Sequence, residues 1–328
     1  MSRRYLVTGG SGFLGAALVR RLVAEGHAVR VLDNHFRGAP ERLGEALPAV
    51  ELVEADIRDA AAVGGAAKGV DCIAHLAFIN GTEFFYSHPE LVLDVGIRGM
   101  LNVIDAARAN GVGELCVASS SEVYQTPPAV PTDENVPLSI PDVTNPRYSY
   151  GGGKLLCELM AMNYGRSGFE RVTVFRPHNV YGPDMGWEHV LPQFVLRALD
   201  AVKATPTGPV PFPIQGDGSQ TRAFVHVDDF TDGLLRVLMQ GKHLSVYHIG
   251  NPEEVTIAAA ARLVLARFGR EAQLLPMPAP PGGTPRRSPD IRKLAALGYA
   301  PRIPLAAGLP SLVDWYVANQ HRRPRKIA

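Results

Sequence analysis

The stretch RYLVTGGSGFLGAALVRRLVAEG, residues 4–26, predicts the fold of this chain. Residues 4–9 read as a short buried strand, and residues 13–26 have the apolar spacing of a helix that ends at Gly26. Between them lies TGGSGFLG, residues 8–15. Its glycines permit a tight turn and let a backbone approach a pyrophosphate at the helix N-terminus. The stretch therefore predicts a strand–turn–helix unit that binds a dinucleotide.

The glycines of this turn fit the dinucleotide fingerprint in two frames, in which Gly9 or Gly10 is followed by Gly12 and Gly15. Asp33 ends the second predicted strand, about twenty residues after the turn. A carboxylate at that place can accept a hydrogen bond from a ribose 2′-hydroxyl, and it repels a 2′-phosphate. We therefore predict that the cofactor is NAD.

Two further residues bear on the cofactor. Asp56 ends the third predicted strand and is placed to meet the adenine. Arg37 lies four residues after Asp33, and a cation there leaves NADP open as an alternative.

The first half of the chain alternates strand and helix patterns. The predicted strands cover 4–9, 28–33, 50–56, 70–77, 114–120 and 171–177, and the predicted helices between them include 13–26, 91–110 and 150–167. Such alternation predicts an α/β fold, in which a Rossmann-like doubly wound parallel sheet is covered by helices on both faces.

The residue composition of the sequence changes beyond about residue 180. Proline and glycine crowd residues 206–220 and 276–290, which we interpret as long ordered loops. Helical patterns return at 190–203, 228–241, 256–268 and 308–320. We therefore predict an NAD-binding Rossmann domain over 1–180, to which some later segments return, and a smaller α/β substrate-binding domain over 181–328.

Composition excludes several classes of protein. The chain has 328 residues and a formal net charge of +1, so no charge bias favours nucleic acid or a membrane surface. No apolar run approaches the ~20 residues that span a bilayer. The three cysteines are far apart and without metal-ligand spacing. We expect a cytoplasmic protein with no metal site.

Two stretches in the middle of the chain carry polar groups that suit catalysis. YSYGGGK, residues 148–154, places Tyr150 and Lys154 four residues apart on one helix face. A neighbouring ammonium and a nicotinamide cation lower the pKa of a tyrosine, so that it can act as a base. VASSSEVY, residues 117–124, puts hydroxyls and a carboxylate at the end of a predicted parallel strand, where a ligand crevice is expected.

Taken together, these features resemble the extended short-chain dehydrogenase/reductase family, and within it the nucleotide-sugar epimerases and dehydratases. The resemblance rests on the glycine turn, Asp33, the serine-rich strand end, the Tyr150/Lys154 pair and RPHNVYGP, residues 176–183. It runs along essentially the whole chain, since GDGSQTRAFVHVDD (216–229) and RRSPDI (286–291) are similar to the substrate half of the family.

The resemblance implies a set of site residues and a nucleotide-diphosphate sugar as the partner. The catalytic residues it implies are Tyr150, Lys154, Ser120, Ser121, Glu122 and His189. The cofactor-binding residues are Gly9, Gly12, Phe13, Leu14, Asp33, Asn34, Asp56, Ile57, Leu76, Ala77, Tyr150 and Lys154. Ser120, Asn179, Arg222 and Arg287 are expected to bind the substrate. A homodimer through a four-helix interface is also implied.

The chain departs from the family pattern at several positions. Gly96 stands where an asparagine near the cofactor is common, and His178 replaces a commoner phenylalanine. Gln125 follows Tyr124 where glycine is usual. Three glycines, 151–153, fill the start of the catalytic helix, and each costs about 1 kcal/mol of helix propensity. We therefore expect close packing around that helix.

Glu122 decides between the possible reactions. The run Ser-Ser-Glu, residues 120–122, resembles the Thr-Ser-Glu of UDP-glucuronate decarboxylases and GDP-mannose dehydratases. In the dehydratases this glutamate removes the C5 proton, which is acidic next to a C4 ketone. We therefore predict C5 or C3 proton chemistry, with His189 as a second acid or base, by a dehydratase or a 3,5-epimerase that recycles NAD. A simple 4-epimerase and a UDP-glucuronate decarboxylase stay open. So do a net NAD(P)-dependent oxidoreductase on a non-sugar substrate and a non-catalytic dinucleotide sensor.

Overall fold

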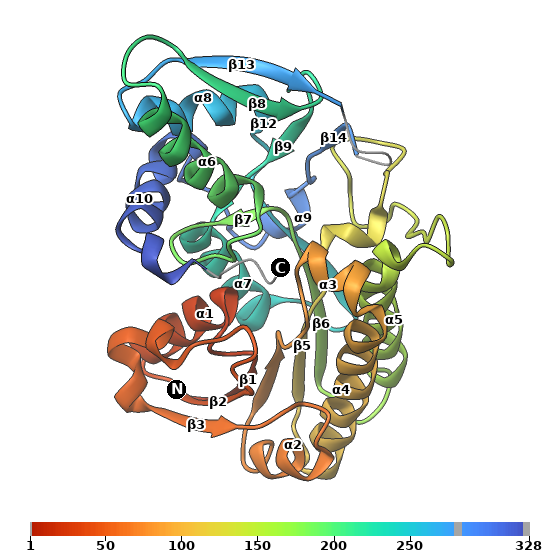
Figure 1. Ribbon diagram of the computed structural model, residues 1–328. Coiled ribbons are helices and arrows are strands. Elements are labelled where there is room, and N and C mark those ends of the chain that lie inside the picture. Colours follow the sequence, from red (N-terminus) through yellow and green to blue (C-terminus); the bar gives the residue numbers. More distant parts are fainter. Residues whose placement is uncertain (1, 279–283, 324–328) are drawn as a thin grey trace.

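The computed structural model describes residues 2–278 and 284–323, and its centre is one seven-stranded sheet (Figure 1). The strand order is β11-β6-β5-β4-β1-β2-β3, with every pair parallel. The strands are β1 (Arg4–Thr8), β2 (Ala28–Asp33), β3 (Val50–Glu54), β4 (Cys72–His75), β5 (Glu114–Ala118), β6 (Arg171–Pro177) and β11 (Ser245–Ile249). The predicted Rossmann-like doubly wound sheet is confirmed, and the order reverses between β1 and β4, where such folds bind ligands.

Helices cover both faces of this sheet. They are α1 (Phe13–Ala24), α2 (Ala60–Ala66), α3 (Thr82–Ser87), α4 (Pro89–Ala109), α5 (Ser149–Tyr164) and α7 (Val227–Gln240). Side chains alternate along β1, so Leu6 packs in the core beneath α2, α4 and α5, while Tyr5 and Val7 pack beneath α1 and α7. This two-sided burial explains why the strand sequences are almost wholly apolar.

The second half of the chain builds a separate core. Its main elements are α6 (Val190–Ala204), β8 (Val210–Gln215), α8 (Ile257–Arg267), β13 (Ala272–Met277) and α10 (Leu305–Ala318). Shorter strands lie in the same half: β7 (Val180–Tyr181), β9 (Thr221–Ala223), β10 (Val225–His226), β12 (Glu254–Thr256) and β14 (Arg286–Arg287). The short helix α9 (Arg292–Ala295) packs on the central sheet, where Leu294 joins the core beneath α1 and α7. Figure 1 shows this half resting above the carboxyl ends of the central strands.

The prediction of long loops in this half was wrong in part. β8 lies inside 206–220 and pairs in parallel with β13. Along β8, Val210, Phe212 and Ile214 are buried while the prolines between them are exposed. The prolines led to the prediction of a loop, but a strand tolerates them here because they occupy its solvent-facing positions. Of the predicted loop 276–290, residues 279–283 lie outside the described residues.

The described residues also include four 3₁₀ helices, three between the main elements and one after α10. They are η1 (Pro40–Ala49), η2 (Ser121–Tyr124), η3 (Pro146–Tyr148) and η4 (Gln320–Arg322). Within the described ranges, no helix is both long enough and apolar enough to cross a bilayer.

Candidate active site

The turn between β1 and α1 is built so that only glycine fits. Gly9 has a φ of +71°, and a Cβ on it would lie 2.7 Å from the amide nitrogen of Ala77. A Cβ on Gly15 would overlap the carbonyl oxygen of Gly9. Gly12 caps α1 without a side chain of its own, so the first amides of the helix face the cavity. This cradle fits a pyrophosphate.

The adenosine end of the cradle is formed at the ends of β2 and β3. The Asp33 carboxylate accepts hydrogen bonds from the amides of Ser11 (3.0 Å) and His35 (2.9 Å), which fixes it beside the glycine turn. Asn34 donates to Asp56 at 3.0 Å. A fixed carboxylate at this position suits a ribose hydroxyl, so the residues present fit NAD.

A single cavity of about 1170 Å³ runs along the carboxyl ends of the central strands. This is above the range of about 300–1,000 Å³ for one small ligand, so it leaves room for a dinucleotide together with a second molecule. All the predicted cofactor-binding residues line it. These are Gly9, Gly12, Phe13, Leu14, Asp33, Asn34, Asp56, Ile57, Leu76, Ala77, Tyr150 and Lys154.

Tyr150 and Lys154 project from α5 into the far end of this cavity. Tyr150 stacks on Phe85, with ring centroids 4.8 Å apart, and Phe78 meets it edge-on at 5.4 Å. Lys154 donates to the carbonyl of Ala118 at 2.7 Å and lies 4.0 Å above the Phe78 ring centroid. The aromatic wall excludes water, and the strand-end carbonyl orients the ammonium.

Burial sets the protonation of this pair in the free protein. It raises the pKa of Tyr150, although the Ser120 hydroxyl acts in the opposite direction. It lowers the pKa of Lys154 to about 8. A neutral phenol becomes a base only when positive charge comes close, and the nicotinamide of bound NAD supplies such a charge.

The serines at the end of β5 have different roles, one in the structure and two in the site. Ser119 donates to Glu158, which forms a buried ion pair with Arg176 at 2.6 Å. Ser120 caps η2 by accepting from the Glu122 amide at 3.1 Å. Ser120 and Ser121 both line the cavity, as expected of polar groups at the end of a parallel strand.

Glu122 is ion-paired with Arg287, which comes from β14 in the second half of the chain. Burial opposes ionisation of this carboxyl, but the charges of Arg287, Arg147 and Arg222 outweigh it and lower the pKa of Glu122. Arg287 is 8% exposed, and its Nε has no partner among the described residues. The pair therefore joins the two halves of the molecule beside Ser120.

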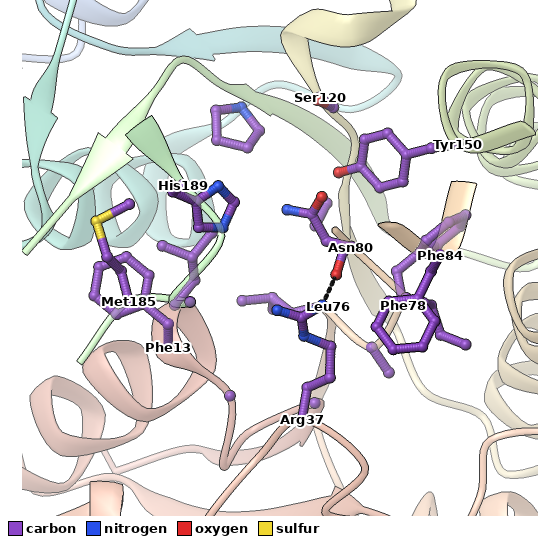
Figure 2. Close-up of a pocket in the computed structure, with 18 of the residues that line it drawn as sticks. Phe13, Arg37, Leu76, Phe78, Asn80, Phe84, Ser120, Tyr150, Met185 and His189 are labelled. Carbon is purple, nitrogen blue, oxygen red and sulfur yellow. Dashed lines mark hydrogen bonds between the residues drawn. The ribbon is translucent and has the colours of Figure 1, made fainter. Parts of the chain in front are cut away.

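The other predicted substrate residues are placed differently. Asn179 lines the cavity, has a φ of +41° and donates to the carbonyl of Ala223 at 3.2 Å. Arg222 lies outside the lining, although it pairs in register with Arg287. His189 lies on the wall opposite Tyr150, near Met185 (Figure 2). Burial and the charge of Arg37 lower the pKa of His189, which favours a neutral imidazole.

Several residues of the cavity escaped the sequence analysis. They include Arg147, Phe78, Asn80, Phe84 and Trp187. Arg147 lies three residues before Tyr150, one turn ahead of it, and this spacing is a signal that could have been used. The aromatic residues lie in segments whose positions depend on tertiary packing, and their sequence pattern is that of ordinary core residues.

Fold and site together define an NAD-dependent enzyme with a Rossmann sheet and a tyrosine–lysine pair. Residues 5–250 match the NAD dependent epimerase/dehydratase family. The chain belongs to this family, and the expected resemblance is confirmed.

Known proteins are similar to this chain along nearly its whole length. A dTDP-4-dehydro-6-deoxy-D-allose reductase from a Streptomyces species is 34% identical over 98% of each chain. UDP-glucuronic acid decarboxylase 2 of Arabidopsis thaliana is 33% identical over 94% of this chain and 67% of its own.

A solved structure agrees with these relatives. The dTDP-glucose 4,6-dehydratase DesIV of Streptomyces venezuelae, crystallised with NAD, is 31% identical. Its TM-score against this chain is 0.85, and the match covers 97% of this chain and 98% of the DesIV chain. The predictions of an NAD-dependent enzyme and of an epimerase or dehydratase function are confirmed at this level.

Proposed function

We propose that this enzyme oxidises C4 of a nucleotide-diphosphate sugar and then removes the proton from C5 of the resulting ketone. The observation that carries the proposal is Glu122, a partly exposed carboxylate held by Arg287 beside Ser120 and Tyr150. A C5 proton is acidic only next to a C4 ketone. The Tyr150/Lys154 pair supplies the base that the oxidation to this ketone requires.

Each residue has a defined task in this scheme. Tyr150 takes the proton of the C4 hydroxyl, and Lys154 stabilises the phenolate electrostatically. Ser120 donates a hydrogen bond to the same sugar oxygen. When bound in this cavity, NAD would supply the hydride acceptor for C4 and, in a later step, the hydride that goes back to the sugar. Asn179 and Arg287 contact the substrate from the second half of the chain, and Arg222, which stands beside Arg287, adds positive charge from outside the cavity.

Glu122 then acts as the base at C5, and His189 is its candidate partner on the opposite wall. The carboxylate is ionised at neutral pH because its pKa is lowered. Arg287 leaves Glu122 a weak base in the free protein. Contact between Arg287 and a substrate anion would release the carboxylate when the substrate is in place.

The test is turnover in deuterium oxide with NMR of the product. We expect deuterium at C5 (at C3 as well for a 3,5-epimerase), and none with Glu122→Gln. A product inverted at C4 without solvent deuterium would remove the proposal and leave a simple 4-epimerase.

A UDP-glucuronate decarboxylase is a second candidate, which one observation favours. Arg147, Arg222 and Arg287 all lower the pKa of the Glu122 carboxyl, so this end of the site has more positive than negative charge and suits an acidic sugar. Similarity to UDP-glucuronic acid decarboxylases supports it. Release of carbon dioxide from a nucleotide-linked uronic acid, with deuterium at C5, distinguishes this reaction from dehydration of a neutral sugar.

Recycling of NAD separates both candidates from a net reductase or oxidoreductase. We expect denatured protein to release NAD(H), and turnover to proceed without added cofactor. Stoichiometric oxidation or reduction of added cofactor during steady turnover would instead indicate a net redox enzyme, as in the similar allose reductase.

We also propose a homodimer in the cytoplasm, with the domain division expected above. The buried, unpaired cysteines 72, 116 and 157 support a reducing compartment. The return of β11 to the central sheet supports a first domain that includes later segments.

A further inference from the structure

Arg37 lies in the middle of the cavity, although its position in the sequence suggested the 2′-end of the cofactor. Figure 2 shows its guanidinium between Phe13 and Met185 on one side and Phe78 and Phe84 on the other. Nη1 donates to the carbonyl of Asn80, and the guanidinium lies 5.5 Å from the Phe84 ring centroid. The side chain thus extends across the cleft and away from the Asp33 carboxylate.

The second contact of Arg37 comes from the other half of the chain. Nη2 donates to Glu188 at 3.2 Å, and Glu188 directly precedes His189. Two glycines make room for the guanidinium: a Cβ on Gly81 would overlap Nη1, and one on Gly186 would lie 3.0 Å from Nη2. Both walls of the cleft are therefore shaped around this one side chain.

The place of Arg37 matches one part of a dinucleotide. The adenosine end is set by Asp33 and the nicotinamide end by Tyr150 and Lys154, so the pyrophosphate has to lie between them. The uncapped N-terminus of α1 attracts this anion from one side. Arg37 lines the same cavity, and a guanidinium has five donors, more than its two contacts use.

The Glu188 contact can give way to a stronger one. The two side chains are 29% and 37% exposed, and exposed ion pairs are weak. An arginine–phosphate contact is stronger and is often bidentate. A bound pyrophosphate therefore competes with Glu188 for the guanidinium.

We propose that Arg37 binds the pyrophosphate of NAD, exchanging Glu188 for it, and that it does not recognise a 2′-phosphate. This assignment does not depend on which sugar reaction the enzyme catalyses. Arg37 is a cofactor-positioning residue, held ready by the Asn80 carbonyl.

The test is binding of four ligands to protein stripped of copurified dinucleotide. Calorimetry follows NAD, NADP and ADP-ribose, and ligand-observed NMR follows adenosine. With Arg37→Gln we expect NAD, NADP and ADP-ribose to bind ~10-fold more weakly, with the NAD/NADP ratio and adenosine binding unchanged. Equal thermal unfolding of the stripped variants is the control for folding.

Glu188→Gln supplies a result that structural damage cannot imitate. Removal of the competing carboxylate should strengthen NAD binding ~2–5-fold, and the double variant should bind like Arg37→Gln alone. If Arg37→Gln weakened the binding of NADP alone, Arg37 would instead recognise the 2′-phosphate. An equal loss for adenosine, or weaker NAD binding in Glu188→Gln, would also overturn the assignment.

Discussion

Four consecutive polar residues follow β5, and they have different roles. Ser119 supports the buried Glu158–Arg176 pair, Ser120 caps η2, and Glu122 joins Arg287 from β14. Ser121 lines the cavity beside them. A structural hydroxyl and catalytic groups can thus be neighbours in sequence, because consecutive side chains after this strand meet different partners.

Removal of the phenol oxygen tests the assigned base. Tyr150→Phe should retain NAD and the fold but oxidise the sugar at least ~100-fold more slowly, because no group remains to take the C4 hydroxyl proton. Stopped-flow absorbance of the reduced nicotinamide measures this step. Tyr148→Phe, two residues earlier and outside the cavity lining, is the matched control and should react at the normal rate.

The Glu122–Arg287 pair gives a prediction about pH. Activity that needs ionised Glu122 falls as the pH drops through its pKa, which Arg287 holds low. In Arg287→Met, burial remains while the cation is lost, so the pKa rises and the acid limb of the rate profile moves to higher pH. The maximal rate should also fall ~100-fold.

The neighbouring Arg286→Met is the control for this experiment. Arg286 is exposed and pairs with Glu254 on the surface, so its loss should change neither the rate nor the profile. An acid limb that stays in place in Arg287→Met would show that Glu122 is not the titrating group.

At the scale of elements, one glycine in α4 and one in α5 are explained by the aromatic ring of Phe78. A Cβ on Gly96 would overlap the Phe78 ring, and one on Gly153 would lie 3.1 Å from it. Phe78 in turn contacts Tyr150 and Lys154. The glycines thus bring a ring against the catalytic pair, at a cost in helix propensity.

Two alanine substitutions, one in each helix, separate packing from propensity. At Gly152 a Cβ would lie at an ordinary 3.4 Å from Ile140, so Gly152→Ala should stabilise the protein by ~0.5–1 kcal/mol. Gly96→Ala must displace Phe78 and should destabilise it by ~1–3 kcal/mol. Urea unfolding of the stripped protein measures both, and a stabilising Gly96→Ala would contradict the packing argument.

At the scale of the whole molecule, the two halves meet around one cleft, and the outer face of the first half is open. α4 and α5 lie side by side at the edge of the molecule (Figure 1). Leu93, Leu156 and Leu159 are 38%, 44% and 52% exposed on them. Apolar side chains gathered on a helix pair favour association with another protein surface.

The proposed homodimer uses this helix pair. The double substitution Leu156→Glu with Leu159→Glu should convert the dimer to a monomer, because it buries charges in the interface. Light scattering after size-exclusion chromatography gives the mass. Leu275→Glu, at a leucine of 38% exposure on β13, is the control and should stay dimeric. A monomeric unmodified protein would refute the dimer itself.

The sequence by itself determined six of the seven strands of the sheet, the dinucleotide site and the tyrosine–lysine pair, but it did not predict β11. These depend on local patterns: a glycine turn between strand and helix, a carboxylate at the next strand end, and a four-residue spacing on one helix. Local geometry brings such residues together wherever the remainder of the chain lies. The strand β8, whose exposed prolines resembled a loop, shows the limit of this reasoning.

Only the tertiary structure decided how the distant residues meet. Glu122 and Arg287 are 165 positions apart, and Arg37 and Glu188 are 151 apart. Arg222 lies outside the cavity lining, and Arg37 points to the middle of the cavity and away from its adenosine end. Such contacts depend on how the second half packs on the first, and no short-range pattern in a sequence encodes the direction of a long, flexible side chain across a cleft.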